Sequence, residues 1–311
     1  MARRGKSKAE KAGDWLSDLA VRLLIGAALR LPYERRLALV GWAMRRVVAP
    51  LAGYRARALA NLAYVFPQMP LAERRRIAQG VAENVGRTLI ENYSTEEFTA
   101  RMARLPLQGE GVAALEAARA AGQPVILVTG HFGNYEAGRA ALVARGHDIG
   151  GLYRPMKNIY FNDHYVKTMQ AFGGPVFAQG RRGTAGFVRH LRAGGMLVLL
   201  FDQHVRNEPV LDFLGKPART PTSSADLARR YGALLLPFYA TRAEDGVGFT
   251  VELEAPVPHG PPEAMMQALN DGLAARVRAR PEQWFWFHNR WKGAGEGPGK
   301  KPPRQPRGKP R

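Results

Sequence analysis

The chain has 311 residues, enough for one large α/β domain or for such a core with a helical extension. Apolar residues make up 46% of it, which excludes wholesale disorder, and the absence of cysteine excludes disulfides, thiolate metal ligands and a cysteine nucleophile. The net charge is +20; residues 1–12 carry +4 of it and residues 293–311 carry +5, so the body keeps +11. A basic body favours anionic partners such as nucleic acid, lipid headgroups or an acidic carrier protein.

The first predicted element is a helix over residues 14–31 with an unusually wide apolar surface. One narrow stripe interrupts that surface at every fourth position: Asp14, Asp18, Arg22, Gly26 and Arg30. The pattern fits a helix lying in a membrane interface and equally a buried core helix, and the basic residues on both flanks favour the membrane. We expect no secretory signal, because no small-residue cleavage site closes an apolar stretch. No apolar run reaches the roughly 18 residues that a spanning helix needs.

The following elements divide the chain into a helical part and an α/β part. Further helices are predicted over residues 34–49, 55–65 and 71–91. From about residue 107, short apolar runs alternate with helical segments, which predicts a sheet covered by helices. The predicted strands are 124–129, 148–153, 175–178, 196–201, 233–240 and 249–255. The predicted helices between and after them are 134–145, 158–172, 185–194, 224–232 and 262–279.

The fold class is therefore α/β, with a mixed sheet flanked by helices and a helical, membrane-associated N-terminal region. Four segments are expected: a basic disordered N-terminus (1–12), the helical region (13–106), the α/β core (107–292) and a basic disordered tail (293–311). The tail is rich in glycine, proline, lysine and arginine, a composition that does not pack into a core.

The stretch HFGNYE, residues 131–136, carries the strongest signal for chemistry. The strand before it delivers His131 to the carboxyl end of the sheet, where active sites of open α/β sheets lie. Asn134 can cap the next helix, and Glu136 would lie in its first turn, near enough to reach the imidazole. A histidine and a carboxylate with no serine or cysteine nucleophile point to a general base that activates the substrate's own hydroxyl.

Two other interpretations of His131 and Glu136 stay open. An isolated pair at this spacing also occurs as a surface pair. It could also supply two ligands of a metal site, with a third from His164, Asp163 or Asp202. None of these residues stands at a recognisable metal spacing, so we expect neither a metal nor a cofactor.

Several blocks of the chain resemble one known family. HFGNYE is similar to the H-x4-D/E motif of membrane glycerolipid and lipid A acyltransferases. Four further blocks follow the order found in the late acyltransferases of bacterial lipid A biosynthesis, the lauroyl/myristoyl transferases: ANLAYVFPQMPLAERRRIA (60–78), LYRPMKN (152–158), LFDQHVRNEPVLDFLGKPARTPTSSADLARRYGALLLP (200–237) and PEQWFWFHNRWK (281–292). The resemblance runs from about residue 15 to residue 292.

The resemblance implies transfer of a fatty acyl chain from acyl carrier protein to a hydroxyl of a lipid A precursor. It also implies a glycerolipid-acyltransferase-like fold at the cytoplasmic face of a bacterial inner membrane. The chain departs from the family at two places. Charged residues interrupt the N-terminal apolar anchor, which favours monotopic attachment over spanning, and the segment TPTSSA (220–225) carries no glycine.

Within this framework His131 is the expected base, and Glu136 is expected to orient it and stabilise its imidazolium. Backbone N–H groups or a nearby cation are expected to stabilise the oxyanion. The expected substrate-binding residues are Asn134, Arg154, Arg181, Asp202, Gln203 and Arg290. Arg154 is the candidate cation, although a structural ion pair fits it as well, and Asp202 is expected to bind the acceptor or hold Arg154.

Arg181 and Arg182 stand in a QGRRG loop that could meet sugar phosphates or the acidic carrier, and an ordinary solvated loop fits them equally. Arg290 lies in the aromatic block WFWFHNRWK, whose tryptophans are expected to pack in the core or at an interface. Aromatic-plus-basic segments also occur in nucleic-acid binders.

Three rival functions follow from the same residues. A basic nucleic-acid-binding protein would explain the charge, but the bases are scattered and no nucleic-acid-binding module is present, so no nucleic acid is expected. An acyltransferase of the same fold could act on another membrane lipid, such as a glycolipid or an ornithine lipid. A catalytically inactive lipid-binding scaffold is disfavoured by the presence of both His131 and Glu136.

Overall fold

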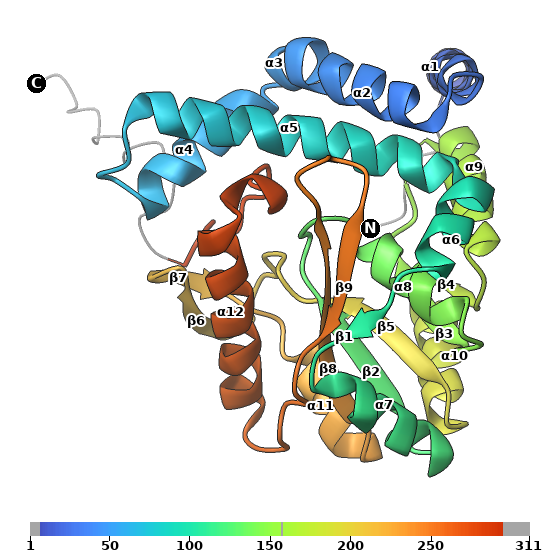
Figure 1. Ribbon diagram of the computed structural model, residues 1–311, viewed down its shortest axis with the longest axis vertical. Coiled ribbons are helices and arrows are strands. Elements are labelled where there is room, and N and C mark those ends of the chain that lie inside the picture. The colour runs from blue at the N-terminus through green and yellow to red at the C-terminus, as the bar shows by residue number, and fades with distance from the viewer. Residues whose placement is uncertain (1–6, 157, 295–311) are drawn as a thin grey trace, which may run out of the picture.

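The computed structural model describes residues 7–156 and 158–294, and its centre is a seven-stranded sheet (Figure 1). The strand order is β1-β9-β8-β2-β5-β3-β4, and all neighbours in it are parallel except β8 and β9. The bounds are β1 Leu107–Gln108, β2 Val125–Thr129, β3 Ile149–Tyr153, β4 Val176–Ala178, β5 Met196–Leu200, β8 Leu234–Arg242 and β9 Phe249–Leu253. The expected mixed α/β sheet flanked by helices is confirmed.

The central strands are continuous apolar runs, which must be covered on both faces of the sheet. A parallel arrangement provides this cover, because its crossover helices lie on those faces. Every residue of β2, with the sequence VILVT, is buried, and β5 reads MLVLL. Parallel neighbours require helical crossovers, which lie on the sheet faces. These helices are α7 Gly111–Ala120, α8 Tyr135–Val143, α9 Ile159–Ala171, α10 Arg181–Arg192, α11 Ser223–Tyr231 and α12 Pro262–Ala279.

The helices α1 to α5 form a layer across one end of the sheet, and α6 turns from the end of α5 to lie beside α8 (Figure 1). Their bounds are α1 Lys8–Leu29, α2 Tyr33–Ala43, a π-helical turn Met44–Val48, α3 Ala49–Leu51, α4 Tyr54–Val65, α5 Leu71–Tyr93 and α6 Thr95–Ala103. The long helix α5 lies beside the carboxyl end of β2. Side chains of α5 line the same cavity as His131, which follows that strand. The α5 helix therefore forms a wall of the region in which the site was expected.

The outward face of α1 is apolar, so the interpretation of α1 as a buried core helix is wrong. Asp18, Ile25 and Ala28 are buried, whereas the large apolar side chains point away from the protein. The exposed ones include Trp15, Leu16, Leu19, Leu23 and Leu24. In the described residues, helix length and apolar content nowhere reach what a membrane crossing requires.

Several boundaries and elements differ from the prediction. Helix α1 already begins at Lys8, inside the segment expected to be disordered, because Ser7 and Glu10 form a capping box. The rest of the two terminal segments, residues 1–6 and 295–311, lies outside the described residues. The prediction did not include α6, α7 or β1. It also lacked a hairpin of β6 Val210–Phe213 and β7 Lys216–Arg219.

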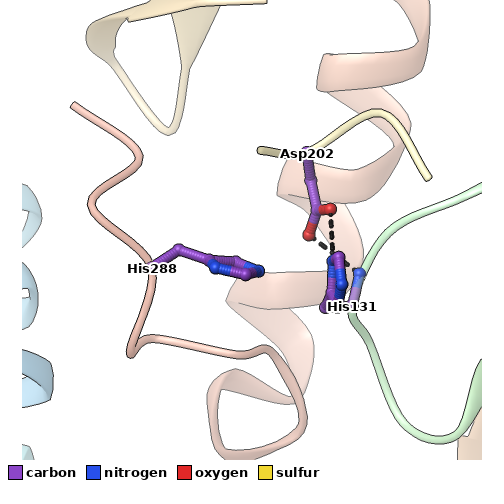
Figure 2. A group of neighbouring side chains, drawn as sticks. All are labelled: His131, Asp202 and His288. Carbon is purple, nitrogen blue, oxygen red and sulfur yellow. Dashed lines mark hydrogen bonds and ion pairs between the residues drawn. The ribbon is translucent and has the colours of Figure 1, made fainter. Parts of the chain in front are cut away.

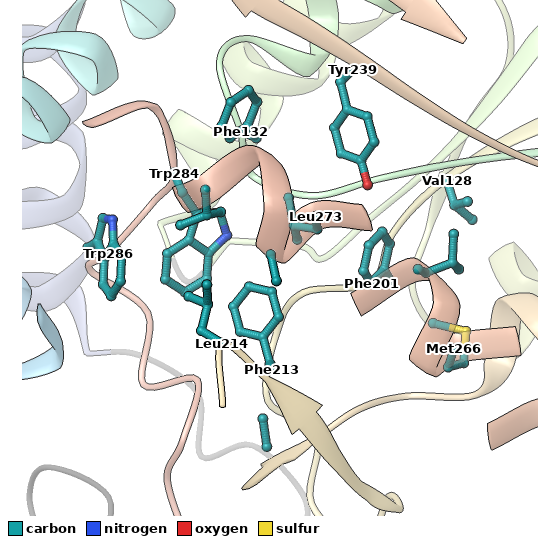
Figure 3. Close-up of a cluster of buried hydrophobic side chains, with 14 of the residues drawn as sticks. Val128, Phe132, Phe201, Phe213, Leu214, Tyr239, Met266, Leu273, Trp284 and Trp286 are labelled. Atoms are coloured by element: carbon teal, nitrogen blue, oxygen red, sulfur yellow. The ribbon is translucent and has the colours of Figure 1, made fainter. Parts of the chain in front are cut away.

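The core is divided between the two sheet faces, and the C-terminal aromatic block fills one of them (Figure 3). Trp284, Trp286 and Trp291 are buried there, as expected. The indole of Trp284 lies 5.3 Å from the ring of Phe213 on β6, centroid to centroid. This packing joins the last described segment of the chain to the loop region that follows β5.

Candidate active site

His131 is placed by a tight turn between β2 and α8. Gly133 has φ +56°, and a Cβ built on it would come within 1.9 Å of the carbonyl oxygen of Ala240. Only glycine tolerates both the backbone conformation and this approach. The turn leaves His131 at the carboxyl end of β2 with a partly exposed side chain, 22% accessible.

The partner of the imidazole is Asp202, which follows the neighbouring strand β5. Its Oδ1 lies 2.7 Å from His131 Nδ1, and its Oδ2 accepts the backbone N–H of His131 at 2.8 Å and the indole N–H of Trp284 at 2.9 Å. Figure 2 shows the carboxylate facing His131. Asp202 is fully buried, so these contacts fix both the carboxylate and the ring.

This geometry selects one tautomer of His131. With a carboxylate at Nδ1, that nitrogen carries the proton and donates it to Asp202. The lone pair is then on Nε2, which lies 3.2 Å from the side-chain amide nitrogen of Gln203. Gln203 therefore donates to the same nitrogen that would accept a proton from a substrate.

Electrostatics keep Asp202 ionised. Burial alone would raise the pKa of Asp202, but the charge of His131, the hydrogen bonds that it donates and the nearby His288 together hold this pKa well below its usual range. His288 lies edge-on to His131 at 4.5 Å between ring centroids. Burial first, and then the charge of His131, lower the pKa of His288 to about 3. His288 is therefore a neutral neighbour of the base at neutral pH.

In the described residues, one group of side chains could hold a metal ion: His131, Asp202 and His288. Their ligand atoms lie within 4.8 Å of one another. The oxygens of Asp202, however, already accept three protein hydrogen bonds, and the Nδ1 proton of His131 is one of the donors. The contacts therefore fit a hydrogen-bonded acid–base pair. The other candidate ligands, Asp163 and His164, lie on α9, where the His164 ring stacks on Tyr93.

Glu136 does not occupy the position expected for it. It is buried in the first turn of α8, where its Oε2 accepts from Arg139 at 3.1 Å. The place at His131 Nδ1 belongs to Asp202, so the expected contact between Glu136 and the imidazole is wrong. The expectation that Asp202 holds Arg154 is wrong for the same reason, because its oxygens accept from His131 and Trp284.

Two of the expected substrate-binding residues are instead buried structural groups. Asn134 caps α8, as expected, by accepting from the backbone N–H of Glu136 at 3.1 Å, and its amide donates to Glu91 at 2.9 Å. Arg290 is fully buried and donates to Thr220 at 2.7 Å and to the carbonyl of Arg219. Neither side chain is available to a substrate in this arrangement.

The remaining expected residues are exposed. Arg154 stands in the loop after β3, and Arg181 and Arg182 stand in the first turn of α10. Arg181, Arg182, Arg189 and Arg192 line one open hollow on α10. This surface is separate from the His131–Asp202 pair, and it is strongly basic.

A largely apolar cavity of about 220 Å³ opens beside His131. Two rows of side chains from α5 form one wall, and each row repeats every four residues: Val81, Val85 and Leu89, and Asn84, Thr88 and Asn92. Tyr135, Tyr165 and Phe285 complete the lining near the histidine. A cavity of this kind suits an extended apolar group whose reactive end lies at His131.

The backbone donors around the motif are already engaged. The N–H groups of His131, Phe132, Gly133 and Asn134 bond to Asp202, Gly130, Gln283 and Ala240, respectively. Backbone stabilisation of an oxyanion at these four positions would therefore break an existing hydrogen bond. Among the described residues, the side-chain amide of Gln203 lies 3.2 Å from His131 Nε2, so it is a donor beside the reacting position.

The carboxyl edge of this α/β sheet thus holds a histidine–carboxylate pair beside a largely apolar cavity, an arrangement suited to general-base activation of a hydroxyl. The chain belongs to the bacterial lipid A biosynthesis acyltransferase family, whose model matches residues 5–293. It is thus an acyltransferase, and the resemblance drawn from the sequence blocks is confirmed.

Individual relatives agree with this assignment. The chain is 26% identical to the lipid A biosynthesis lauroyltransferase of Escherichia coli over 290 residues, covering 91% of this chain and 93% of the relative. It is 25% identical to a lipid A biosynthesis acyltransferase of Haemophilus influenzae over 239 residues, 75% and 74% of the two chains. A phosphatidylinositol mannoside acyltransferase of Mycobacterium tuberculosis is 28% identical over 185 residues, 58% of each chain.

Proposed function

We propose that the protein transfers a fatty acyl chain from an acyl carrier protein thioester to a hydroxyl of a lipid A precursor. The observation that carries the proposal is the His131–Asp202 pair at the mouth of the apolar cavity. The cavity would receive the acyl chain, and the pair would supply the base. The family supports acyl transfer to lipid A, and the acyl carrier protein thioester is the donor that the resemblance of the sequence blocks implies.

The proposed reaction is a direct transfer. His131 Nε2 takes the proton of the acceptor hydroxyl, and the oxygen attacks the thioester carbonyl carbon. The tetrahedral intermediate then expels the carrier's sulfur, which receives the proton back from His131 Nε2. Asp202 holds the ring in the required tautomer and stabilises the imidazolium that forms between the two steps. This assigns to Asp202 the role first expected of Glu136.

Stabilisation of the oxyanion is assigned to side chains. The amide of Gln203 already points at the reacting nitrogen, and a substrate oxygen entering there would take over its hydrogen bond. Arg154, exposed just after β3, is proposed as a cationic second donor for the oxyanion or for a phosphate of the acceptor. The basic face of α10, which includes Arg181, is proposed to dock the acidic carrier.

The proposed location is the cytoplasmic face of a bacterial inner membrane, with monotopic attachment. The apolar outward face of α1 supports this location, because such a face is stable when it is buried in lipid. The charge of +20 supports contact with an anionic surface.

The test uses the detergent-purified protein, acyl carrier protein thioester and a lipid A precursor, with the lipid product weighed by mass spectrometry. Wild type is expected to add the mass of one acyl chain, and His131→Ala to add none. Asp202→Asn and Glu136→Gln separate the two carboxylates. Asp202→Asn should lower the rate on the order of 10²- to 10⁴-fold in protein that still folds. It should also lower the melting temperature, because an amide N–H₂ replaces an oxygen that accepts buried N–H groups. Glu136→Gln should lower the melting temperature, because it breaks the buried pair with Arg139.

Two outcomes would change the assignment. Turnover by His131→Ala would remove that residue as the base. Full activity of Asp202→Asn, with a folded but inactive Glu136→Gln, would return the orienting role to Glu136.

A second candidate acceptor is another membrane glycolipid, which the relationship to a phosphatidylinositol mannoside acyltransferase favours. The same assay with a glycolipid acceptor decides between the two.

A further inference from the structure

The cavity beside His131 is called the acyl cavity, after its proposed occupant. A second cavity, of about 240 Å³, lies between α1 and α9, on a different face of α9 from the acyl cavity. It is lined by Trp15, Asp18, Arg22, Asp163, His164 and Lys167, together with a tyrosine. Tyr165 lines the acyl cavity instead. On a helix, position 165 points well away from positions 163, 164 and 167, so α9 separates the two cavities.

Asp18 is an unusual residue for such a place. It is only 4% exposed, and its Oδ1 accepts no hydrogen bond from the described residues. Its Oδ2 has Arg22 at 3.7 Å, which is an ion pair but too long for a hydrogen bond. A buried carboxylate oxygen without a donor is costly, so the position calls for a ligand that donates hydrogen bonds.

The other charges around the cavity define what that ligand carries. Asp18 and Asp163 supply two negative charges, and Arg22 and Lys167 supply two positive charges. His164 is neutral, because burial, followed by the charge of Arg22, lowers its pKa, and its Nε2 is buried without a hydrogen-bond partner in the described chain. The lining is therefore balanced, and it matches a zwitterion better than a simple cation or anion.

The position of the cavity points to a lipid as the source of this zwitterion. Trp15 stands at the cavity and is 49% exposed, and it is continuous with the apolar outward face of α1. Tryptophan side chains at a membrane interface lie at the level of the headgroups. Lipid chains lying along the apolar face of α1 would therefore place a headgroup at the cavity.

We propose that this cavity binds the headgroup of a phosphoethanolamine lipid and thereby fixes α1 against α9 at the membrane surface. The primary ammonium donates to Asp18 Oδ1 and faces Asp163, and the phosphate lies at Arg22 and Lys167. A choline headgroup has no N–H to donate, so it leaves Asp18 Oδ1 without a partner. The proposal rests on the proposed membrane attachment and is independent of the acyl-transfer chemistry.

The test measures partition of the full chain onto vesicles of phosphatidylcholine alone and of phosphatidylcholine mixed with phosphatidylethanolamine. Wild type is expected to partition roughly tenfold more strongly onto the mixed vesicles, the value of one charge-assisted hydrogen bond. Asp18→Asn should lose this preference. Asp14→Asn, which removes the same charge one turn earlier and outside the cavity lining, should keep it.

A second variant guards against misfolding. Lys167 is exposed, so Lys167→Gln is expected to fold, and it should weaken the same preference through the phosphate. Equal partition of wild type onto both vesicles, or an unchanged preference in Asp18→Asn, would overturn the headgroup site and leave the membrane attachment intact. No partition onto any vesicle would overturn both.

Discussion

A small number of contacts sets the tautomer of His131, the proposed base. Asp202 fixes the proton on His131 Nδ1, and Trp284 and the backbone N–H of His131 fix Asp202. Trp284 is itself held in the buried aromatic block, so the orientation of the catalytic ring depends on core packing at the end of the chain. The pair is therefore preorganised before any substrate arrives.

Gln203 is the first residue at which this arrangement makes a quantitative prediction. Gln203→Met keeps the approximate size of the side chain and removes the N–H donor beside His131 Nε2 without adding a charge. We expect kcat to fall on the order of 10²- to 10³-fold with KM nearly unchanged, the effect of losing one oxyanion donor. Steady-state kinetics with an acyl carrier protein thioester measures it. A rise in KM alone would mean that Gln203 only binds substrate.

His288 predicts a dependence of stability on pH. Its pKa is about 3 in the folded protein and 6.5 when exposed, so the unfolded chain binds the proton between these values and the folded protein does not. The unfolding free energy is not reduced by His288 above pH 6.5, and it falls as the pH drops from 6.5 towards 3. At pH 5, the loss of unfolding free energy that His288 causes is on the order of 2 kcal/mol.

We therefore expect His288→Gln to reduce the loss of unfolding free energy between pH 7 and pH 5 by about this amount, as measured by urea titration at each pH. His147, His164 and His204 also have lowered pKa values, so part of the loss remains in the variant. A variant with the same pH dependence as wild type would contradict the burial of a neutral His288.

The sequence predicted His131, the proposed base, but not the carboxylate that contacts it. His131 stands directly after a buried strand, and that local pattern predicts the carboxyl edge of the sheet. Asp202 also follows a predicted strand, but it lies 71 residues away. The sequence carries no local signal that β2 and β5 are neighbours. It favours Glu136 as the partner of the imidazole because Glu136 lies close to His131 along the chain. The pairing of strands is a property of the whole sheet.

At the scale of elements, the wall of the acyl cavity depends on how closely α2 approaches α5. A Cβ on Gly86 of α5 would lie 2.6 Å from the carbonyl oxygen of Val40 and 2.9 Å from the Cα of Gly41, so the two helices touch at their backbones. Other faces of the same helix carry the two rows that line the cavity. A change in the α2–α5 distance therefore moves the cavity wall.

Gly86→Ala is expected to destabilise the protein by about 1–3 kcal/mol, because the added methyl group forces the helices apart. Gly26→Ala on α1 is the matched control, since a Cβ there meets nothing within 4 Å. That variant should be neutral or more stable by about 0.5–1 kcal/mol, the usual gain from replacing a helical glycine. Thermal unfolding of both variants measures the difference. Equal effects would show that backbone approach at Gly86 does not matter.

Elements with a strong period were predictable, and those held by distant contacts were not. Helix α12 begins and ends at the predicted residues, because its buried positions repeat with the helical period along the whole segment. The β6–β7 hairpin was missed. Its turn uses Leu214 and Gly215, both with positive φ, and a leucine does not mark such a turn in a sequence. The hairpin packs against the tryptophans of the C-terminal block, a contact that the sequence does not reveal.

At the scale of the whole molecule, the net charge and the apolar face of α1 both favour contact with an anionic membrane. The charge of +20 attracts the chain to an anionic surface, and α1 presents its large apolar side chains outward. The two forces differ in range and in their dependence on salt. Electrostatic attraction weakens as salt rises, whereas burial of apolar side chains does not. Attachment that survives high salt therefore measures the contribution of α1.

Leu24 isolates that contribution, because it is 72% exposed and points away from the buried side of α1. Leu24→Gln should weaken partition onto vesicles at high salt roughly tenfold, the loss of about 1.5 kcal/mol from one buried leucine. Val210→Gln is the control, since Val210 is 46% exposed on the β6–β7 hairpin, far from α1 in Figure 1. Activity on detergent-dispersed lipid should be unchanged in both variants, because neither residue lines the acyl cavity. If both variants bound vesicles as wild type does, attachment would rest on charge alone, and the apolar face of α1 would need a different partner.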